Sequence, residues 1–261
     1  MRLYFPLLAF LMLIAALAAN DTSAQERPPN FVVVLTDDLG IGDIGPYGNT
    51  LIQTPHLDRM AAEGAVLTNF YAAANVCTPS RGGLLTGRYP ARLGLALNDV
   101  ARATNKIGLA GSEITIATAL KERGYATACI GKWHLGQQPD QWVTAHGFDY
   151  FYGLPYSNDM FPLALYRNDE TIEEPVDQTT LTERYTAEAI QFMEEHKDGP
   201  FFVYVPHSMP HVPLFVSEKF EGRSQAGLYG DVIETIDWSM GEIFAALDRL
   251  GVADNTLVLF T

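Results

Sequence analysis

Four short apolar runs limit what this chain can fold into more than any other feature of its sequence. Each run is rich in β-branched and aromatic residues, and none alternates polar with apolar side chains. Each is therefore expected to be a strand buried on both faces, as in parallel sheets that helices cover on both sides. The four runs are Phe31–Leu35, Ala126–Ile130, Phe201–Val205 and Thr256–Phe260.

Helical patterns lie between these runs, and glycine or proline marks most of their ends. Because strand and helix alternate along the chain, we predict an α/β fold with a mostly parallel sheet flanked by helices. The stretch from Gly136 to Glu174 is rich in proline, glycine and aromatic residues, and we expect it to form loops over one face. The expected helices are Thr54–Glu63, Ile114–Arg123, Leu181–His196 and Asp231–Leu250.

The first residues carry the pattern of an export signal. Arg2 precedes an apolar run from Leu7 to Ala19, and small residues follow that run. Residues 1–24 are predicted to be a Sec-type signal peptide, because the apolar run is short for a membrane-spanning helix; an uncleaved anchor is the alternative. The protein is then expected to be exported, to a periplasm or out of the cell.

The net charge of the chain is −14, and this charge excludes some classes of partner. A strongly negative protein repels nucleic acids and anionic membrane surfaces, so we expect neither as a partner. No membrane contact is expected beyond export. A site for an anionic ligand must therefore draw its positive charge from residues close to it.

The two cysteines leave alternatives open. Cys77 and Cys129 can form a disulfide in an exported protein, but Cys129 lies in an expected interior strand, which favours a buried free thiol. Pro79 is expected at the first position of a short helical stretch ending at Gly87. Cys77 is therefore expected near a helix N-terminus, where free N–H groups attract anions. Arg81, one turn further on, adds donors for a tetrahedral oxyanion.

Polar residues follow three of the expected strands, at the edge where ligands bind in such sheets. Asp37 and Asp38 follow the first strand; paired carboxylates suit Ca²⁺ or Mg²⁺, with a turn as the alternative. Lys132 and His134 follow the second strand and share one face of an extended segment, so both can approach one anion. His211 follows the third strand in a proline-rich loop, which can hold an imidazole in one direction.

These motifs together resemble the formylglycine-dependent sulfatases, nearest the arylsulfatase A-like branch of the alkaline phosphatase superfamily. The matching segments are Cys-Thr-Pro-Ser-Arg from Cys77, Asp-Asp-Leu-Gly from Asp37, Gly-Lys-Trp-His-Leu-Gly from Gly131 and Pro-His-Val-Pro from Pro210. The block-by-block match is more specific than any single motif. It implies the fold of that superfamily, a large α/β domain around a mixed sheet.

The resemblance also implies roles for individual residues. In that family a formylglycine-generating enzyme reads Cys-x-Pro-Ser-Arg and oxidises the cysteine to an aldehyde, so this enzyme is an expected partner. The implied cation is Ca²⁺, with Mg²⁺ as the alternative. The implied catalytic residues are Cys77, Arg81 and His134, the implied substrate-binding residues are Lys132, His211 and Ser157, and the implied metal ligands are Asp37, Asp38 and Cys77. Asp43 and His207 are expected to be structural.

The activity that the resemblance implies is hydrolysis of the sulfate ester of a small molecule or glycan, with release of inorganic sulfate. The alternatives are a phosphate or phosphonate ester hydrolase of the same superfamily and a non-catalytic binder of sulfated glycans. In related sulfatases the strand matching Thr256–Phe260 leads into an Asp-Asn-Gly segment and, later, a sulfate-contacting lysine. Residues 25–261 are therefore expected to be the N-terminal part of a sulfatase catalytic domain, incomplete at the C-terminus and nearly inactive alone.

Overall fold

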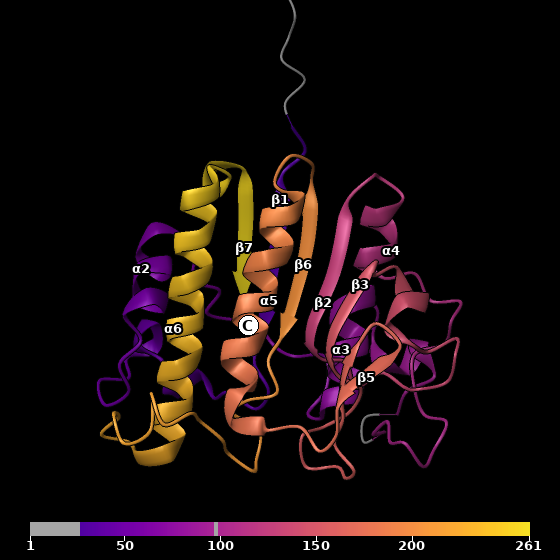
Figure 1. Cartoon of the computed structure of the whole chain (residues 1–261), viewed down its shortest axis with the longest axis horizontal. Helices are drawn as coiled ribbons and strands as arrows, with labels where there is room; N and C mark the ends of the chain where they lie inside the picture. Colours follow the sequence, from indigo (N-terminus) through magenta and orange to yellow (C-terminus); the bar gives the residue numbers. More distant parts are fainter. Residues whose placement is uncertain (1–26, 97–98) are drawn as a thin grey trace, which may run out of the picture.

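A seven-stranded sheet runs through the middle of the protein (Figure 1). The computed structural model describes residues 27–96 and 99–261, so the expected signal peptide, residues 1–24, lies outside the described residues. The strands are β1 (Asn30–Leu35), β2 (Ala126–Lys132), β3 (Tyr150–Leu154), β4 (Leu165–Arg167), β5 (Glu170–Glu173), β6 (Phe201–Pro206) and β7 (Thr256–Phe260).

Five neighbouring strands are parallel, in the order β3-β2-β6-β1-β7, and β4 and β5 extend the sheet antiparallel beyond β3. Strand β1 lies near the centre, where Val33 is opposite Tyr204 of β6 and Leu259 of β7. The structure confirms the predicted mostly parallel α/β fold. Because parallel strands end at the same edge, the residues that follow β1, β2 and β6 are brought together there.

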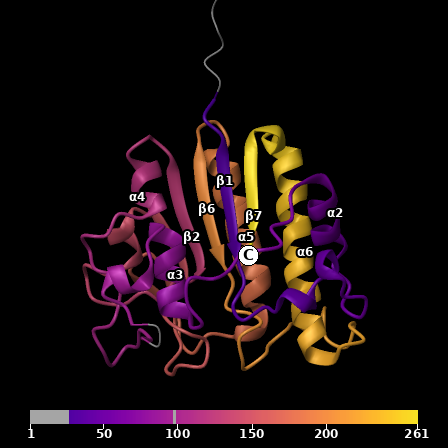
Figure 2. The same cartoon turned by 180° about the vertical axis from the view of Figure 1, so that it is seen from behind.

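Helices cover both faces of the sheet (Figures 1 and 2). Helices α5 and α6 lie on one face, and α3 and α4 lie on the other. No helix within residues 27–96 and 99–261 combines the length and apolar character needed to cross a bilayer. The helices are α2 (Pro55–Glu63), α3 (Cys77–Thr86), α4 (Ile116–Lys121), α5 (Leu181–His196) and α6 (Gly227–Leu250), with short 3-10 turns at Ile41–Asp43, Gly45–Tyr47, Pro90–Leu93, Val143–His146, Gln178–Thr180 and Ala253–Asn255.

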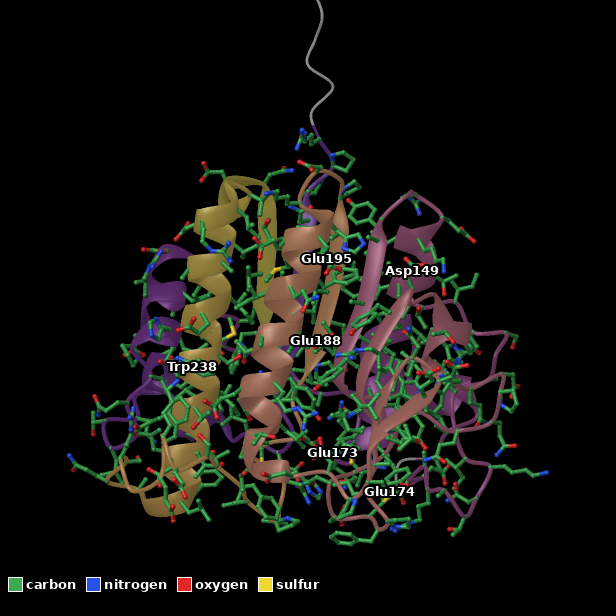
Figure 3. The ribbon with its side chains drawn as sticks, in the orientation of Figure 1. Asp149, Glu173, Glu174, Glu188, Glu195 and Trp238 are labelled. Carbon is green, nitrogen blue, oxygen red and sulfur yellow. The ribbon has the colours of Figure 1, made fainter. Side chains whose placement is uncertain are left out.

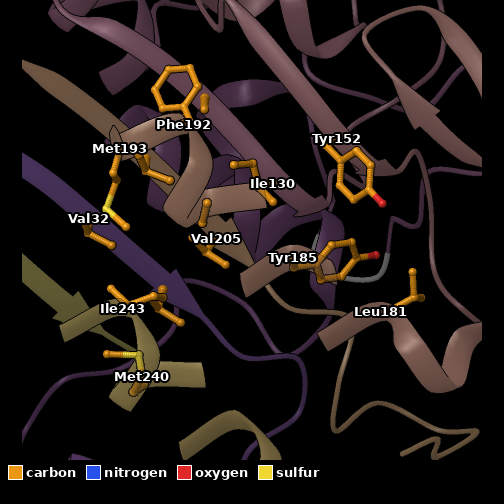
Figure 4. Close-up of a cluster of buried hydrophobic side chains, with 14 of the residues drawn as sticks. Val32, Ile130, Tyr152, Leu181, Tyr185, Phe192, Met193, Val205, Met240 and Ile243 are labelled. Atoms are coloured by element: carbon orange, nitrogen blue, oxygen red, sulfur yellow. The ribbon is translucent and has the colours of Figure 1, made fainter. Parts of the chain in front are cut away.

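Alternate residues of the central strands enter two separate cores, which explains why these strands are apolar throughout. On the α5 and α6 side, Val32 and Val205 pack with side chains such as Met193 and Ile243 (Figure 4). On the α3 and α4 side, the neighbouring strand residues, Tyr204 among them, enter a second apolar cluster. Both faces of β1, β2 and β6 are therefore buried, as the sequence predicts.

Strand β7 differs from the expectation that it is buried on both faces. Its Leu257 and Leu259 are 50% and 44% exposed, although its bounds agree with the expected run. In the described part of the chain β7 pairs only with β1, so it is an edge strand. An apolar run does not reveal how many neighbours a strand has, and this is the reason for the difference.

The expectation of loops from Gly136 to Glu174 is wrong in part, because this stretch contributes β3, β4 and β5 to the sheet. Four of the eight aromatic residues in this stretch are strand residues, and one of them, Phe151 of β3, is fully buried. Among the helices, α5 has the expected bounds, whereas α6 begins four residues before the expected Asp231. Helix α4 is shorter than expected at both ends.

At Gly131, near the end of β2, the backbone packs closely against the backbones of β3 and β6. Gly131 lies opposite Gly153 of β3 and has a φ of +139°. A Cβ atom on Gly131 would lie 2.0 Å from the carbonyl oxygen of Pro206, at the end of β6. Only glycine allows this approach, and Lys132 is the next residue.

We predict that Gly131→Ala lowers the free energy of unfolding by about 3 kcal/mol or more, because the methyl group meets backbone and the φ is unfavourable. The matched control is Gly199→Ala, where nothing lies within 4 Å of the new methyl group, and its effect should stay within about 1 kcal/mol. Equilibrium urea unfolding of the purified protein measures both. Equal stability of the two variants would contradict the prediction.

Candidate functional site

The residues that follow β1 and β6 lie side by side, because hydrogen bonds continue beyond the ends of the strands. The amide of His207 donates to the carbonyl of Leu35 at 2.8 Å, and the amide of Asp37 donates to the carbonyl of Met209 at 3.1 Å. The two segments that leave β1 and β6 therefore form one surface with Asp37 at its centre. The segment after β2 completes this surface.

Asp37 is buried and forms ion pairs with two buried cations. One carboxylate oxygen is 3.2 Å from Nη2 of Arg81, and the other accepts a hydrogen bond from Nζ of Lys132. Burial alone would raise the pKa of Asp37, but the charges of Arg81 and Lys132 outweigh it, so the pKa lies below its usual value. Two cations and one anion leave an excess positive charge, which suits an anionic ligand.

The predicted residues Ser157 and Lys132 are also in contact. Nζ of Lys132 donates to Oγ of Ser157 at 3.0 Å, and Nη1 of Arg81 donates to the carbonyl oxygen of Lys132 at 2.6 Å. With Asp37, four of the predicted site residues form one continuous polar network. The network joins β1, α3, β2 and the segment after β3.

The negative charge of the protein is carried in part far from this network. Glu188 and Glu195 extend from α5, on the opposite face of the sheet from α3 (Figure 3). Glu188 is 3.2 Å from Nη2 of Arg167 and so belongs to a surface ion pair. These two acidic side chains lie across the sheet from α3, so they do not pair with Arg81 or Lys132.

Cys77 is the first residue of α3, with Val76 as the N-cap. The side chain of Val76 does not cap this end of the helix, and the first backbone N–H groups of a helix have no partner within it, so they can bind an anion. Pro79 is the third helical residue rather than the first, so the helix begins earlier than expected. Both cysteines are free, which confirms the expectation of a buried free thiol at Cys129. Burial raises the pKa of Cys129, so this thiol stays protonated.

His134 is buried, and its hydrogen bond defines its tautomer. Nε2 lies 3.0 Å from the carbonyl oxygen of Ala101, which can only accept, so Nε2 carries the proton. Nδ1 has no hydrogen-bond partner among the described residues and keeps a free lone pair. Burial, followed by the charges of Lys132 and Arg81, lowers the pKa of His134 far below its usual value, although Asp37 opposes this shift. His134 is therefore a neutral base.

His211 and Asp38 face each other at the rim of the site. Nε2 of His211 lies 3.9 Å from a carboxylate oxygen of Asp38, whose side chain is 68% exposed. Asp38 also has a φ of +70°. The sequence did not single out Asn158, whose side-chain amide donates to the carbonyl oxygens of His211 and Pro213 at 3.3 and 3.1 Å. Asn158 therefore ties the Ser157 segment to the His211 loop.

His207 and Asp43, both expected to be structural, lie outside the polar network. His207 is completely buried, and burial lowers its pKa to about 4. Asp43 accepts hydrogen bonds from the amide of Gly40 and the hydroxyl of Tyr229, at 2.8 and 2.6 Å. Asp43 thus connects its own loop to α6, whereas the ring nitrogens of His207 have no hydrogen-bond partner among the described residues.

The described residues supply only part of a divalent-cation site. Carboxylates such as those of Asp37 and Asp38 are the hard ligands that Ca²⁺ and Mg²⁺ prefer. Both oxygens of Asp37, however, are engaged by Arg81 and Lys132. Within residues 27–96 and 99–261, no group of three or more His, Cys, Asp or Glu side chains could hold a metal ion. The metal ligands implied by the sequence therefore stay a prediction.

We predict that Asp37→Asn lowers the free energy of unfolding by about 3–5 kcal/mol, because Arg81 and Lys132 then face each other buried and unpaired. The matched control is Asp38→Asn, which removes one charge from an exposed side chain and should change stability by no more than about 0.5 kcal/mol. Urea unfolding in metal-free buffer compares the two variants. A stable Asp37→Asn variant would show that the buried charges of Arg81 and Lys132 do not need the charge of Asp37.

Comparisons with known proteins identify the family of this chain. Residues 29–261 match the family model described as Sulfatase. N-acetylgalactosamine-6-sulfatase of Homo sapiens is 41% identical to the chain over 263 residues, covering 92% of this chain and 50% of the human protein. Steryl-sulfatase of Homo sapiens is 34% identical over 333 residues, covering 97% of this chain and 57% of that protein. The chain thus spans about half the length of the curated relatives it matches.

The fold is similar to that of a solved structure from work on the metabolism of multiple glycosaminoglycans by Bacteroides thetaiotaomicron. The TM-score is 0.84 at 31% sequence identity, over 90% of this chain and 62% of that one. The resemblance noted in the sequence is therefore confirmed at the level of the family. By its sequence, its fold and the residues gathered at its strand ends, the chain belongs to the sulfatase family.

Proposed function

We propose that residues 25–261 are the N-terminal part of a longer sulfatase, the complete protein, and that the complete protein hydrolyses sulfate esters with a formylglycine made from Cys77 as its nucleophile. The observation that carries this proposal is the buried pair of cations, Arg81 and Lys132, with a single carboxylate between them. This group lies beside the uncapped N-terminus of α3, which begins at Cys77. Positive charge and free N–H groups thus meet at the residue that is to react.

The sulfate group binds through Lys132, Ser157 and His211 in this proposal. Lys132 is a point charge held in place by Asp37 and Ser157, so its positive charge has a fixed position at the strand ends. His211 lies at the rim, where the ester oxygen of the leaving group would be. Arg81 is fixed through the carbonyl of Lys132 and offsets negative charge at the nucleophile.

Once Cys77 has been converted, the reaction proceeds in two steps, which are transfer of the sulfuryl group to the diol and release of sulfate. The formylglycine-generating enzyme, with an external oxidant, converts the thiol of Cys77 to an aldehyde, and water adds to give a geminal diol. One hydroxyl of the diol attacks sulfur while its proton passes to the ester oxygen, the S–O bond of the ester breaks, and the alcohol leaves. Nδ1 of His134, the free nitrogen of a neutral imidazole, then takes the proton of the second hydroxyl. The C–O bond to sulfate breaks, sulfate leaves and the aldehyde is restored.

A divalent cation, Ca²⁺ or Mg²⁺, belongs to this proposal as the cofactor. Asp37, Asp38 and the oxidised side chain at position 77 would provide part of its ligands, and further ligands must come from elsewhere in the complete protein. The cation would supply positive charge that offsets the negative charge on the sulfuryl oxygens. Hard oxygen ligands at the ends of parallel strands support this part of the proposal.

The proposed substrate is a sulfated sugar, because the chain is 41% identical to an N-acetylgalactosamine-6-sulfatase over half of that enzyme's length. A sulfated steroid is the alternative, because a steryl-sulfatase is also a relative. Residues 1–24 would direct export to a periplasm or out of the cell, as proposed from the sequence.

The first test uses the complete protein, expressed with a formylglycine-generating enzyme. We expect mass spectrometry of the tryptic peptide Met60–Arg81 to show the aldehyde in place of the thiol. We also expect the protein to release sulfate from an aryl sulfate faster than phosphate from the matching aryl phosphate. The control Cys77→Ala should lose turnover but fold normally.

An unmodified thiol in an active enzyme would overturn the formylglycine proposal. Faster turnover of the phosphate would favour a phosphoesterase of the same fold. Binding of sulfated sugars without any release of sulfate would favour a non-catalytic glycan binder.

A second prediction concerns pH. Because burial, Lys132 and Arg81 lower the pKa of His134, this base stays neutral well below pH 6.5. The turnover number should therefore not fall with a midpoint near pH 6.5 on the acid side, but only at clearly lower pH. A kcat profile measured at saturating aryl sulfate tests this, and a midpoint at the ordinary histidine value would contradict it.

A further inference from the structure

Thr78, the second residue of α3, uses its hydroxyl differently from the other threonine of this helix. The fully buried hydroxyl of Thr78 donates to the carbonyl oxygen of His134 at 2.9 Å and accepts from the amide of Ala101 at 3.0 Å. Thr86, by contrast, donates to Gly82, four residues earlier in the same helix, at 2.7 Å. The bond of Thr86 is the usual one for a helical threonine. Thr78 instead connects two segments outside its helix.

The contacts of Thr78 close a ring that contains the base. Ala101, whose amide donates to Thr78, also provides the carbonyl oxygen that lies 3.0 Å from Nε2 of His134. The backbone of His134 and the backbone that orients its imidazole are thus held by one hydroxyl. Movement of either segment would break a hydrogen bond between buried groups.

The backbone of His134 depends on such contacts. Its φ is +57°, in the left-handed region that residues other than glycine rarely adopt. The surrounding structure must therefore hold this conformation. Two hydrogen bonds do so on either side of the residue: the amide of His134 donates to the carbonyl of Pro155 at 3.1 Å, and the carbonyl of His134 accepts from Thr78. Only the second depends on a side chain.

We propose that Thr78 is a positioning residue for His134: its hydroxyl keeps Nε2–H bonded to Ala101 and thereby leaves Nδ1 as the free, basic nitrogen. This inference rests on the proposed function, in which Nδ1 accepts a proton from the diol. Thr78 directly follows Cys77, so one turn of α3 carries both the nucleophile and the group that holds the base. The distance between them is then set by a single helix.

Three variants of the complete protein, matured with the formylglycine-generating enzyme, test the proposal. Thr78→Val keeps the shape but removes the hydroxyl, Thr78→Ser keeps the hydroxyl, and Thr86→Val removes a hydroxyl from the same helix without touching His134. Mass spectrometry of the Cys77 peptide gives the converted fraction, and rates are expressed per converted site. This separates an effect on catalysis from an effect on maturation.

We expect Thr78→Val to lower kcat about ten-fold or more, with KM changed less than about three-fold, because proton transfer is impaired while sulfate binding is not. The kcat of Thr78→Ser should stay within about three-fold of that of the unaltered enzyme, and the kcat of Thr86→Val should equal that of the unaltered enzyme. If Thr78→Val does not fold, Thr78→Ala replaces it. A kcat for the hydroxyl-free variant within two-fold of the unaltered enzyme, or an equal loss in Thr86→Val, overturns the proposal.

The tautomer of His134 is measured separately by long-range ¹H–¹⁵N correlation on histidine-labelled protein, with His134→Gln to assign the signal. We expect the Nε2–H tautomer in the unaltered protein and in Thr78→Ser, and a mixture in Thr78→Val. An unchanged tautomer in Thr78→Val overturns the proposal even if kcat falls. Because this readout needs no turnover, it tests Thr78 even if the protein hydrolyses no sulfate ester, an outcome that would instead refute the proposed function.

Discussion

The ion pairs of Asp37 with Arg81 and Lys132 are the interaction on which the rest of the site depends. Each partner comes from a different element: Asp37 follows β1, Arg81 lies on α3, and Lys132 ends β2. A buried charge is tolerated only when its partners are fixed in place, so these three elements must meet in one arrangement. These three buried side chains together carry two positive charges and one negative charge. One structural requirement thus provides both the alignment of the strand ends and the attraction for an anion.

Much of this fold could be predicted from the sequence, because the central strands are buried on both faces and therefore apolar throughout. The short strands β3 to β5 could not, since aromatic residues such as Phe151 occur in loops as well as in strands. The apolar run of β7 also could not show by itself that Leu257 and Leu259 are exposed, because apolar residues look the same whether a neighbour covers them or not. Local sequence reports the conformation of a segment, whereas its number of neighbours depends on the whole sheet.

The candidate site shows the same division. The motifs identified Asp37, Arg81, Lys132 and Ser157, and the structure joins them in one network. Asn158, which ties two loops together, was not predicted, because its partners are backbone carbonyl groups more than fifty residues away. Every residue has a backbone carbonyl group, so the residue type of the partner does not reveal such a hydrogen bond. A single sequence therefore reveals the groups that do chemistry more readily than those that hold the loops around them.

The different surroundings of the two free thiols have a practical consequence for the study of maturation. Cys129 is completely buried with a raised pKa, whereas Cys77 is partly exposed at the start of α3. A thiol-reactive reagent added to the folded protein should therefore react with Cys77 alone, and only in molecules in which Cys77 has not been converted to formylglycine. Denaturation would then release Cys129 as an internal standard of one thiol per chain. The ratio of the two readings would count the unconverted molecules in any preparation, without digestion and without a substrate.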